Sequence, residues 1–155
     1  MSFVVTGLAA EPFAPLFNLD DAALAARGVI RMTVDSKPGF PCRITLEDAE
    51  PGETVLLLNH EHHDAETPYR SRHAIFVRES AVAPARVENA LPPALAGRLL
   101  AIRSYDAVGM MIDAEVIEGA EAEPLIERFL ADPRAAYLHA HNARRGCFAA
   151  RIDRG

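Results

Sequence analysis

Lysine is the scarcest charged residue in this sequence. Of sixteen basic residues, only Lys37 is a lysine, and all the others are arginines. A catalytic lysine must therefore be Lys37 or be absent. Anion binding must depend mainly on guanidinium groups, which are planar and permanently charged.

Cysteine is also scarce, and long apolar runs are missing. Cys42 and Cys147 are too few for a disulfide scaffold, and neither belongs to a CxxC pair. No apolar run approaches the roughly 18 residues that a membrane-spanning helix needs, so we expect no membrane span. Residues 1–7 contain no basic residue, and we therefore expect no secretory signal and a cytoplasmic protein with reduced thiols.

Common motifs of nucleotide and ester chemistry are absent too. The chain has no glycine-rich phosphate loop, no GxSxG sequence and no GxGxxG after a strand. A net charge of −6 argues against general nucleic-acid binding. Residues 106–132 hold eight acids and one arginine, whereas residues 133–155 hold five arginines and one acid. This asymmetry indicates either a solvated acidic helix beside a basic hairpin or a small anion site on the C-terminal segment.

The residues that are present describe an ordinary globular chain. At 155 residues, half of them apolar, it is long enough to bury a core without metal or disulfide support. Residues 122, 125, 126, 129 and 130 follow helical spacing and form one apolar stripe. Strand-like segments outnumber helices, and most of their connections are too short for parallel crossovers. We therefore predict an α+β fold over residues 1–155 as a single domain: a mixed, mainly antiparallel β-sheet, two to three short helices packed on it, and a C-terminal β-hairpin.

The expected elements follow from these patterns and from the turn residues between them. Strands are predicted over residues 2–8, 29–34, 42–46, 54–60, 73–79, 98–105, 110–118, 135–142 and 146–153. Helices are predicted over residues 20–28, around residue 94, and over the apolar stripe that ends at residue 132.

The C-terminal hairpin carries the densest group of reactive side chains. A turn of residues 143–145 followed by a left-handed Gly146 is a common hairpin connection. Side chains alternate between the two faces of a strand. With this turn, the core face would hold Leu138, Ala140, Phe148, Ala150 and Ile152, and the other face would hold Tyr137, His139, His141, Cys147 and Arg151.

Three interpretations of this polar face remain open. Its side chains could be half-exposed surface or interface groups. His139, His141 and Cys147 could bind Zn²⁺ or Fe²⁺, because both metals accept imidazole and thiolate ligands. Alternatively, Cys147 could be a nucleophile activated by a neighbouring histidine, with Arg144 or Arg151 binding an anionic substrate.

A second histidine-rich segment, HEHHD, covers residues 60–64. It is not a zincin motif, which requires a second histidine four residues after the first. We expect a polar loop from His60 to Ser71, in which His60 points inwards while His62 and His63 point to solvent. A pH-sensitive loop is favoured here over a metal site.

The adjacent segment 67–73 contains Tyr69, Arg70 and Arg72. These two arginines could form a clamp for a carboxylate or phosphate. The favoured interpretation is that they pair with the acids Glu61, Asp64 and Glu66.

Six segments together resemble a known family. They are residues 37–43 (KPGFPCR), 46–53 (LEDAEPGE), 56–62 (LLLNHEH), 67–70 (TPYR), 73–78 (HAIFVR) and 138–147 (LHAHNARRGC). Over essentially its whole length the chain resembles a family of small bacterial proteins catalogued only as domain of unknown function 1203. The resemblance implies a bacterial, stand-alone, cytoplasmic protein. It implies no activity and transfers no catalytic residue.

Three function classes therefore stand side by side. The first is an enzyme or binding protein for a small anionic ligand, with a pocket lined by the polar hairpin face and by residues such as Cys42 from the loops. The second is a non-enzymatic homodimer whose interface is the hairpin face. The third is a Zn- or Fe-binding protein, although we expect no cofactor, no nucleic acid and no membrane partner. The candidate catalytic residues are Cys147, His139 and His141, and the candidate ligand-binding residues are Arg43, Tyr69, Arg70, Arg72, Arg144 and Arg151.

Overall fold

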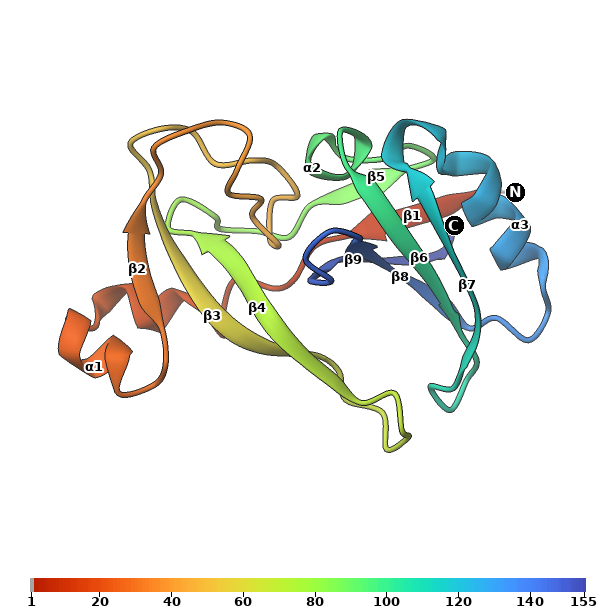
Figure 1. Ribbon diagram of the computed structural model, residues 1–155, viewed down its shortest axis with the longest axis horizontal. Helices are drawn as coiled ribbons and strands as arrows, with labels where there is room; N and C mark the ends of the chain where they lie inside the picture. Colours follow the sequence, from red (N-terminus) through yellow and green to blue (C-terminus); the bar gives the residue numbers. More distant parts are fainter. Residues whose placement is uncertain (1) are drawn as a thin grey trace.

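Two antiparallel β-sheets make up most of the fold (Figure 1). A computed structural model describes residues 2–155. The larger sheet has the strand order β5-β1-β9-β8-β6-β7. Its strands are β1 (Phe3–Thr6), β5 (Arg86–Glu88), β6 (Leu99–Tyr105), β7 (Met111–Glu118), β8 (Tyr137–Asn142) and β9 (Phe148–Arg154).

The smaller sheet has the order β2-β3-β4. Its strands are β2 (Ile30–Thr33), β3 (Thr54–His63) and β4 (Ser71–Arg78). All the paired strands of both sheets within residues 2–155 are antiparallel. An isolated bridge between Cys42 and Phe76 is parallel. The mainly antiparallel α+β fold that the sequence predicts is thus confirmed.

Short helices flank the sheets. They are α1 (Asp21–Ala25), α2 (Pro93–Ala96), α3 (Glu123–Ala131) and the 3-10 turns η1 (Ala14–Asn18) and η2 (Gly119–Glu121). In α3 the predicted apolar stripe is buried, and Pro124 lies in the first turn, where no intrahelical hydrogen bond is lost. The Asp20 side chain caps α1 by accepting a hydrogen bond from the Ala23 amide, at 2.8 Å.

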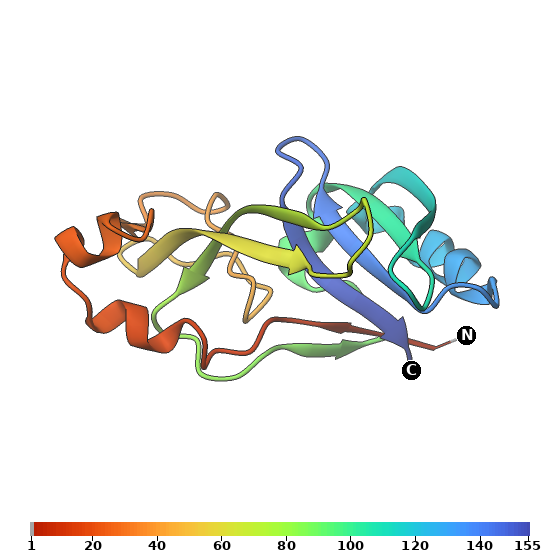
Figure 2. The same ribbon diagram turned by 90° about the horizontal axis from the view of Figure 1, so that it is seen from below.

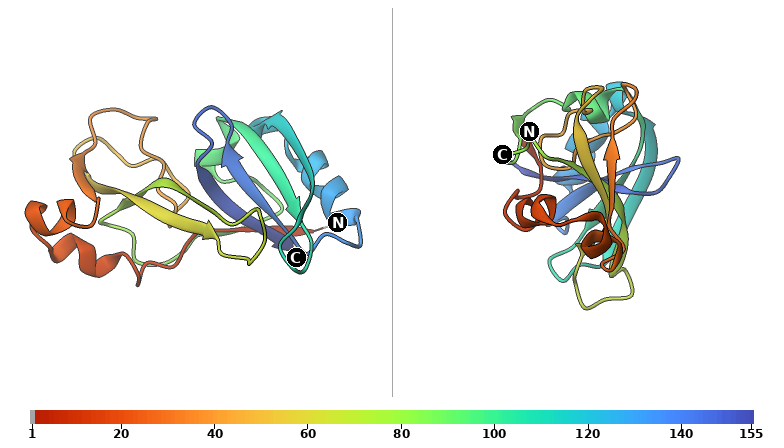
Figure 3. Two further views of the ribbon diagram at one scale, coloured as in Figure 1. Left: turned by 60° about the horizontal axis from the view of Figure 1, so that its bottom comes forward. Right: turned by 90° about the vertical axis from the view of Figure 1, so that its left-hand side faces the viewer.

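Each sheet has its own hydrophobic core. The core of the larger sheet lies against α2 and α3, and the core of the smaller sheet lies against α1 and the chain that precedes it. The face of β8 that is turned away from α3 meets the far end of β3, and Figures 2 and 3 show the β3–β4 hairpin reaching this region. The loop after β3 also contacts the β6–β7 turn, where the Thr67 hydroxyl donates to the Gly109 carbonyl at 3.2 Å.

Two local predictions differ from the structure, and two short elements have no counterpart among the predictions. Residues 60–63 belong to β3 and are not loop, because they continue its pairing with β4 through a β-bulge. Residues 42–46 form a turn with one bridge to β4 and not a strand. The strand β5 and the turn η1 were not predicted, because neither has a periodic apolar pattern. Whether the two sheets fold as a single domain stays a prediction.

No helix within residues 2–155 is long and apolar enough to span a membrane.

Candidate functional site

A cavity of about 460 Å³ lies between the two sheets. One wall comes from β3, β4 and the segment before them, and the other comes from β6, the end of β7 and the turn between β8 and β9. This turn projects from the larger sheet towards the smaller one (Figure 1). The charged lining residues are Arg43, Arg98, Glu118, Arg144 and Arg145, and His73, Asn142 and Cys147 lie among them.

Arg43 forms the buried base of this cavity and is only 3% exposed. Its Nε donates to the Phe148 carbonyl at 2.7 Å, its Nη1 to the Pro41 carbonyl at 2.5 Å, and its Nη2 to the Cys147 Sγ at 3.0 Å. Burial lowers the pKa of Arg43, and the neighbouring Cys147 opposes this effect. The group stays cationic because its ordinary pKa is so high. A single guanidinium therefore ties the segment beside β4 to β9 and brings positive charge to the cavity.

Arg98 is neutralised by a neighbouring acid. Its Nη1 and Nη2 contact the two Asp48 carboxylate oxygens at 2.9 and 2.6 Å. Burial acts to raise the pKa of Asp48, but the hydrogen bonds and charge of Arg98 outweigh it, so the pKa is lowered. This bidentate pair fixes the cavity wall and leaves little charge for a ligand.

Arg144 and Arg145 are the uncommitted cations of the cavity. Both are exposed, and no hydrogen bond or ion pair within residues 2–155 occupies either side chain. Gly146 follows them with φ +80°, which closes the hairpin turn as the sequence predicts. The adjacent Glu118 is the single acid among the residues that line the cavity in this described part of the chain. The cavity is thus locally cationic in a protein with a net charge of −6.

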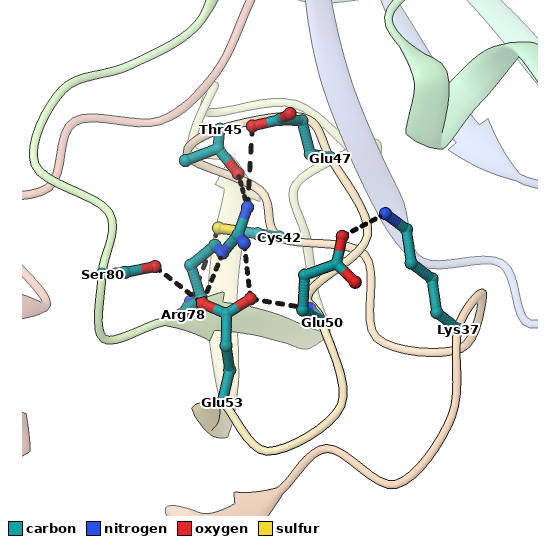
Figure 4. Close-up of polar contacts among 8 residues, drawn as sticks. All are labelled: Lys37, Cys42, Thr45, Glu47, Glu50, Glu53, Arg78 and Ser80. Atoms are coloured by element: carbon teal, nitrogen blue, oxygen red, sulfur yellow. Dashed lines mark hydrogen bonds and ion pairs between the residues drawn. The ribbon is translucent and has the colours of Figure 1, made fainter.

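A polar network holds the loop that supplies the first wall (Figure 4). Arg78 on β4 donates from Nε to a Glu53 oxygen at 3.0 Å, and the Ser80 hydroxyl donates to the same oxygen at 2.7 Å. Hydrogen bonds from Arg78 lower the pKa of Glu53 to about 2. Lys37 pairs with Glu50 farther along the loop. The one lysine of the chain therefore has a structural contact outside the cavity lining.

The structure brings only some of the predicted site residues into this cavity. Arg43, Arg144 and Cys147 line it. Arg70 and Arg72 pair with Glu61 at 3.2 and 3.5 Å, one of the three acids that the sequence favoured as their partners over a ligand clamp.

The remaining predicted ligand residues lie away from the cavity lining. Tyr69 accepts at its carbonyl from Ser71 and contacts the His63 Nδ1 there at 3.2 Å. Arg151 lies over the Tyr137 ring at 4.3 Å. Cys42 is buried at 1% exposure and accepts a hydrogen bond from the Arg78 amide.

Two catalytic candidates, His139 and His141, lie in a separate histidine cluster with His62, His63 and Phe148. The ring centroids of His62 and His141 are 4.9 Å apart, those of His62 and His139 are 6.3 Å apart, and His62 stacks on Phe148 at 5.4 Å. The expectation that His62 and His63 point to solvent is therefore wrong. The extension of β3 carries both side chains against β8.

A β-bulge explains why Cys147 is not in this cluster. Ala140 pairs with Ala150, but His141 pairs with Phe148, so one residue of β9 has no partner. The extra residue turns Phe148 to the histidine face and Cys147 to the opposite face, where the Asn142 amide lies 3.4 Å from its sulfur. The predicted division of the hairpin faces is wrong at these two positions, because register changes by one residue exchange the faces.

Three histidines of the cluster, His62, His139 and His141, are neutral at ordinary pH. Burial is the main cause that lowers the pKa of His62 to about 4, of His139 to about 2 and of His141 to about 3. Both ring nitrogens of His62 and the Nδ1 of His139 are buried without a hydrogen-bond partner. Within residues 2–155 no group of three or more His, Cys, Asp or Glu side chains is placed to hold a metal ion.

Several residues of the cavity and of the histidine cluster escaped the sequence reasoning. Arg98 and Asp48 lie 50 residues apart in the sequence and form an ion pair at the cavity. Asn142 lines the cavity, but its position at the end of a predicted strand does not indicate this. His62 was assigned to solvent. No local pattern marks Arg98, Asp48 or Asn142. The histidine-rich segment marks His62 but does not show that its ring is buried, because β8 covers it from a distant part of the sequence.

Among the comparisons with known proteins, only a family model matches this chain. No curated protein and no solved structure matched the chain. A family model described as "Protein of unknown function (DUF1203)" matches residues 39–154, a range that contains every residue of the cavity lining. The chain therefore belongs to the DUF1203 family.

Proposed function

We propose that this protein binds a small anionic molecule in the cavity between its two sheets. The observation that carries the proposal is the pair Arg144 and Arg145, which line the cavity without an acidic partner in residues 2–155. Guanidinium groups bind carboxylates and phosphates in pairs of hydrogen bonds. The cavity volume of about 460 Å³ falls in the range of small-molecule sites.

The buried Arg43 also supports the proposal. Its three protein contacts use three of the five guanidinium N–H donors. Its charge is buried without a carboxylate partner in the described residues. An anion in the cavity would therefore reduce the electrostatic penalty of this buried cation.

Titration with inorganic phosphate and with butanoate, followed by ¹⁵N–¹H NMR at low ionic strength, tests the proposal. We expect shifts at residues 142–147 and binding that is weakened at least tenfold in the Arg144→Gln/Arg145→Gln double variant, because charge-assisted hydrogen bonds contribute about 1.5–3 kcal/mol each. The matched control is Arg86→Gln/Arg134→Gln, whose arginines pair with Glu88 and Asp132. Equal weakening in the control would show that only net charge matters and would refute the site.

A thiol enzyme that uses the same cavity is a second candidate. The observation in its favour is the 3.0 Å contact between the Arg43 guanidinium and the Cys147 sulfur at the cavity wall. In such an enzyme the sulfur would form a bond to an electrophilic carbon of the ligand. The thiol proton would pass to solvent, and the leaving group would depart with its bonding electron pair.

Alkylation distinguishes the two cysteines. We expect iodoacetamide to modify Cys147 in the folded protein at least tenfold faster than Cys42, because Cys147 lines the cavity and Cys42 does not. The new S–C bond replaces the C–I bond, and iodide leaves. Peptide mass spectrometry measures the modification rate of each cysteine. The C147S and C42S variants, which each lack one thiol, confirm which rate belongs to which cysteine. Equal rates would mean that the cavity does not admit reagents to the thiol.

The middle of the hairpin face is covered within a single chain, which counts against it as the dimer interface. His139 and His141 are 4% and 0% exposed within a single chain, since β3 covers the middle of that hairpin face. Homodimerisation itself stays a proposal, and light scattering over a range of protein concentrations tests it.

A further inference from the structure

We infer that the ligand of this cavity is an amphipathic small anion, a molecule with an anionic end and an apolar body. This inference rests on the proposed function and specifies its ligand class. It comes from the apolar part of the cavity lining, which the arginines do not explain. That part consists of Pro41, Leu57, Ala74, Phe76 and Leu99.

The smaller sheet is apolar on both faces. Leu56 and Leu58 on β3 point into the core shared with α1, so Leu57 points to the other face. The loop of residues 34–53 covers only part of this other face, where Val34 and Ala49 pack on Val55. Two residues farther along β3, Leu57 is only half-buried and lines the cavity. The uncovered part of the apolar face is thus the cavity wall.

An apolar row crosses the sheet at this level. Ile30 on β2 pairs with Leu57, and Leu57 pairs with Phe76 on β4. Residues paired directly across strands lie on one face. Ile30 is 57% exposed and Phe76 is half-buried, so the row continues from solvent into the cavity.

The opposite wall supplies the charge. Leu99 on β6 adds one more half-buried apolar side chain, and beyond it the hairpin turn carries Arg144 and Arg145. An apolar body could contact Leu57, Phe76 and Leu99 while its anionic end meets the two guanidinium groups. Inorganic phosphate or a short carboxylate would satisfy only the arginines.

A series of ligands with one head group and increasing apolar length tests this inference. Butanoate, hexanoate and octanoate are titrated against the full chain by calorimetry, with 1-hexanol as an uncharged ligand. A fully buried methylene strengthens binding about fourfold, and the wall is open on one side. We therefore expect octanoate to bind at least tenfold more tightly than butanoate, and hexanol to bind more weakly than hexanoate.

Two variants assign the gain to the apolar wall. Leu57→Gln should remove most of the difference between octanoate and butanoate. Val82→Gln, at a site that is 85% exposed and outside the cavity lining, should change neither. Circular dichroism and thermal unfolding confirm that both variants are folded, and Leu57→Thr replaces Leu57→Gln if the latter fails.

Each outcome separates the two proposals. Equal binding of all three carboxylates, lost in the Arg144→Gln/Arg145→Gln variant, would overturn the amphipathic ligand and leave the anion site standing. Both proposals would be overturned if octanoate bound more tightly than butanoate, if the Arg144→Gln/Arg145→Gln variant bound octanoate equally well, and if hexanol bound as tightly as hexanoate. Such a result would mean that an apolar surface alone binds these molecules. The absence of binding by every probe at millimolar concentration would overturn the anion site and with it the inference.

Discussion

At pH 5 the protein is expected to be about 4 kcal/mol less stable than at pH 7.5. His139 and His141 have folded-state pKa values of about 2 and 3, whereas an unfolded histidine titrates near 6.5. Between these values only the unfolded chain binds the proton. Each such histidine lowers the free energy of unfolding by about 1.4 kcal/mol per pH unit below 6.5. The stability that the neutral histidines contribute is fully present above pH 6.5 and decreases as the pH falls below this value.

The groups around His139 and His141 also oppose protonation of the cluster and therefore add to the loss of stability at low pH. His62, with a pKa of about 4, adds a further loss over the same pH range, and its partial exposure to solvent reduces that loss. The Arg103 Nη1 lies 3.5 Å from the His141 Nε2, and the charge of Arg151 also opposes protonation of His139. His63 and the Tyr105 and Tyr137 rings complete the surroundings. The cluster therefore contains no carboxylate within residues 2–155 that could stabilise an imidazolium.

Urea unfolding at pH 5 to 7.5 measures this dependence. His139→Phe replaces the imidazole with a ring suited to its aromatic neighbours and should lower the slope by about 1.4 kcal/mol per pH unit. Val82→Gln, at a site that is 85% exposed and carries no ionisable group, should leave the slope unchanged. Glu53, with a folded pKa of about 2, stabilises the protein above its unfolded pKa and loses this effect only as the pH falls from about 4.5 to 2, outside the window. A flat profile for the native protein would contradict the prediction.

Replacing Arg43 with methionine is expected to lower the free energy of unfolding by about 3 kcal/mol. The variant loses three hydrogen bonds to a charged donor, each contributing about 1.5–3 kcal/mol, and leaves the Phe148 and Pro41 carbonyls without that partner. Removal of a buried charge offsets part of this loss. Because Arg43 also joins the two cavity walls, we expect butanoate binding to weaken at least tenfold.

Two further variants make this result specific. Arg43→Lys keeps the charge but cannot form the same fork of contacts, so its stability should lie between those of Arg43→Met and the native protein. Arg72→Met removes an exposed arginine that pairs with Glu61 and should change stability by less than about 1 kcal/mol. An Arg43→Met loss no larger than that of Arg72→Met would contradict the role assigned to Arg43.

Much of the fold could be predicted because its signals are local. The apolar stripe of α3, the Asp20 cap of α1 and the left-handed Gly146 each act within a few residues. The apolar run within residues 54–60 predicts a strand, and the structure confirms it as part of β3. The end of β3 was missed because the polar residues at positions 60–63 are held there by pairing with β4 and by contact with β8.

The candidate site was predicted only in part. The sequence directed attention to Arg43, Arg144 and Cys147, and the structure places all three at one cavity. It also grouped Cys147 with His139 and His141, and a single bulged residue in β9 separates them. A bulge depends on how the neighbouring strand and the cluster pack, and a strand pattern of alternating residues does not contain that information.

The sequence by itself determined the fold class, most of the helices and strands, the near-absence of lysine and thereby the use of arginine for any anion. These properties follow from composition and from contacts between near neighbours in the chain. Only the tertiary structure decided which arginines remain free, because their acidic partners come from distant segments, as Asp48 does for Arg98. It also decided which histidines are buried, since the packing of one sheet on the other removes His139 and His141 from water. Burial and pairing are properties of packed surfaces, and they set the charge of this cavity and the neutrality of these two histidines.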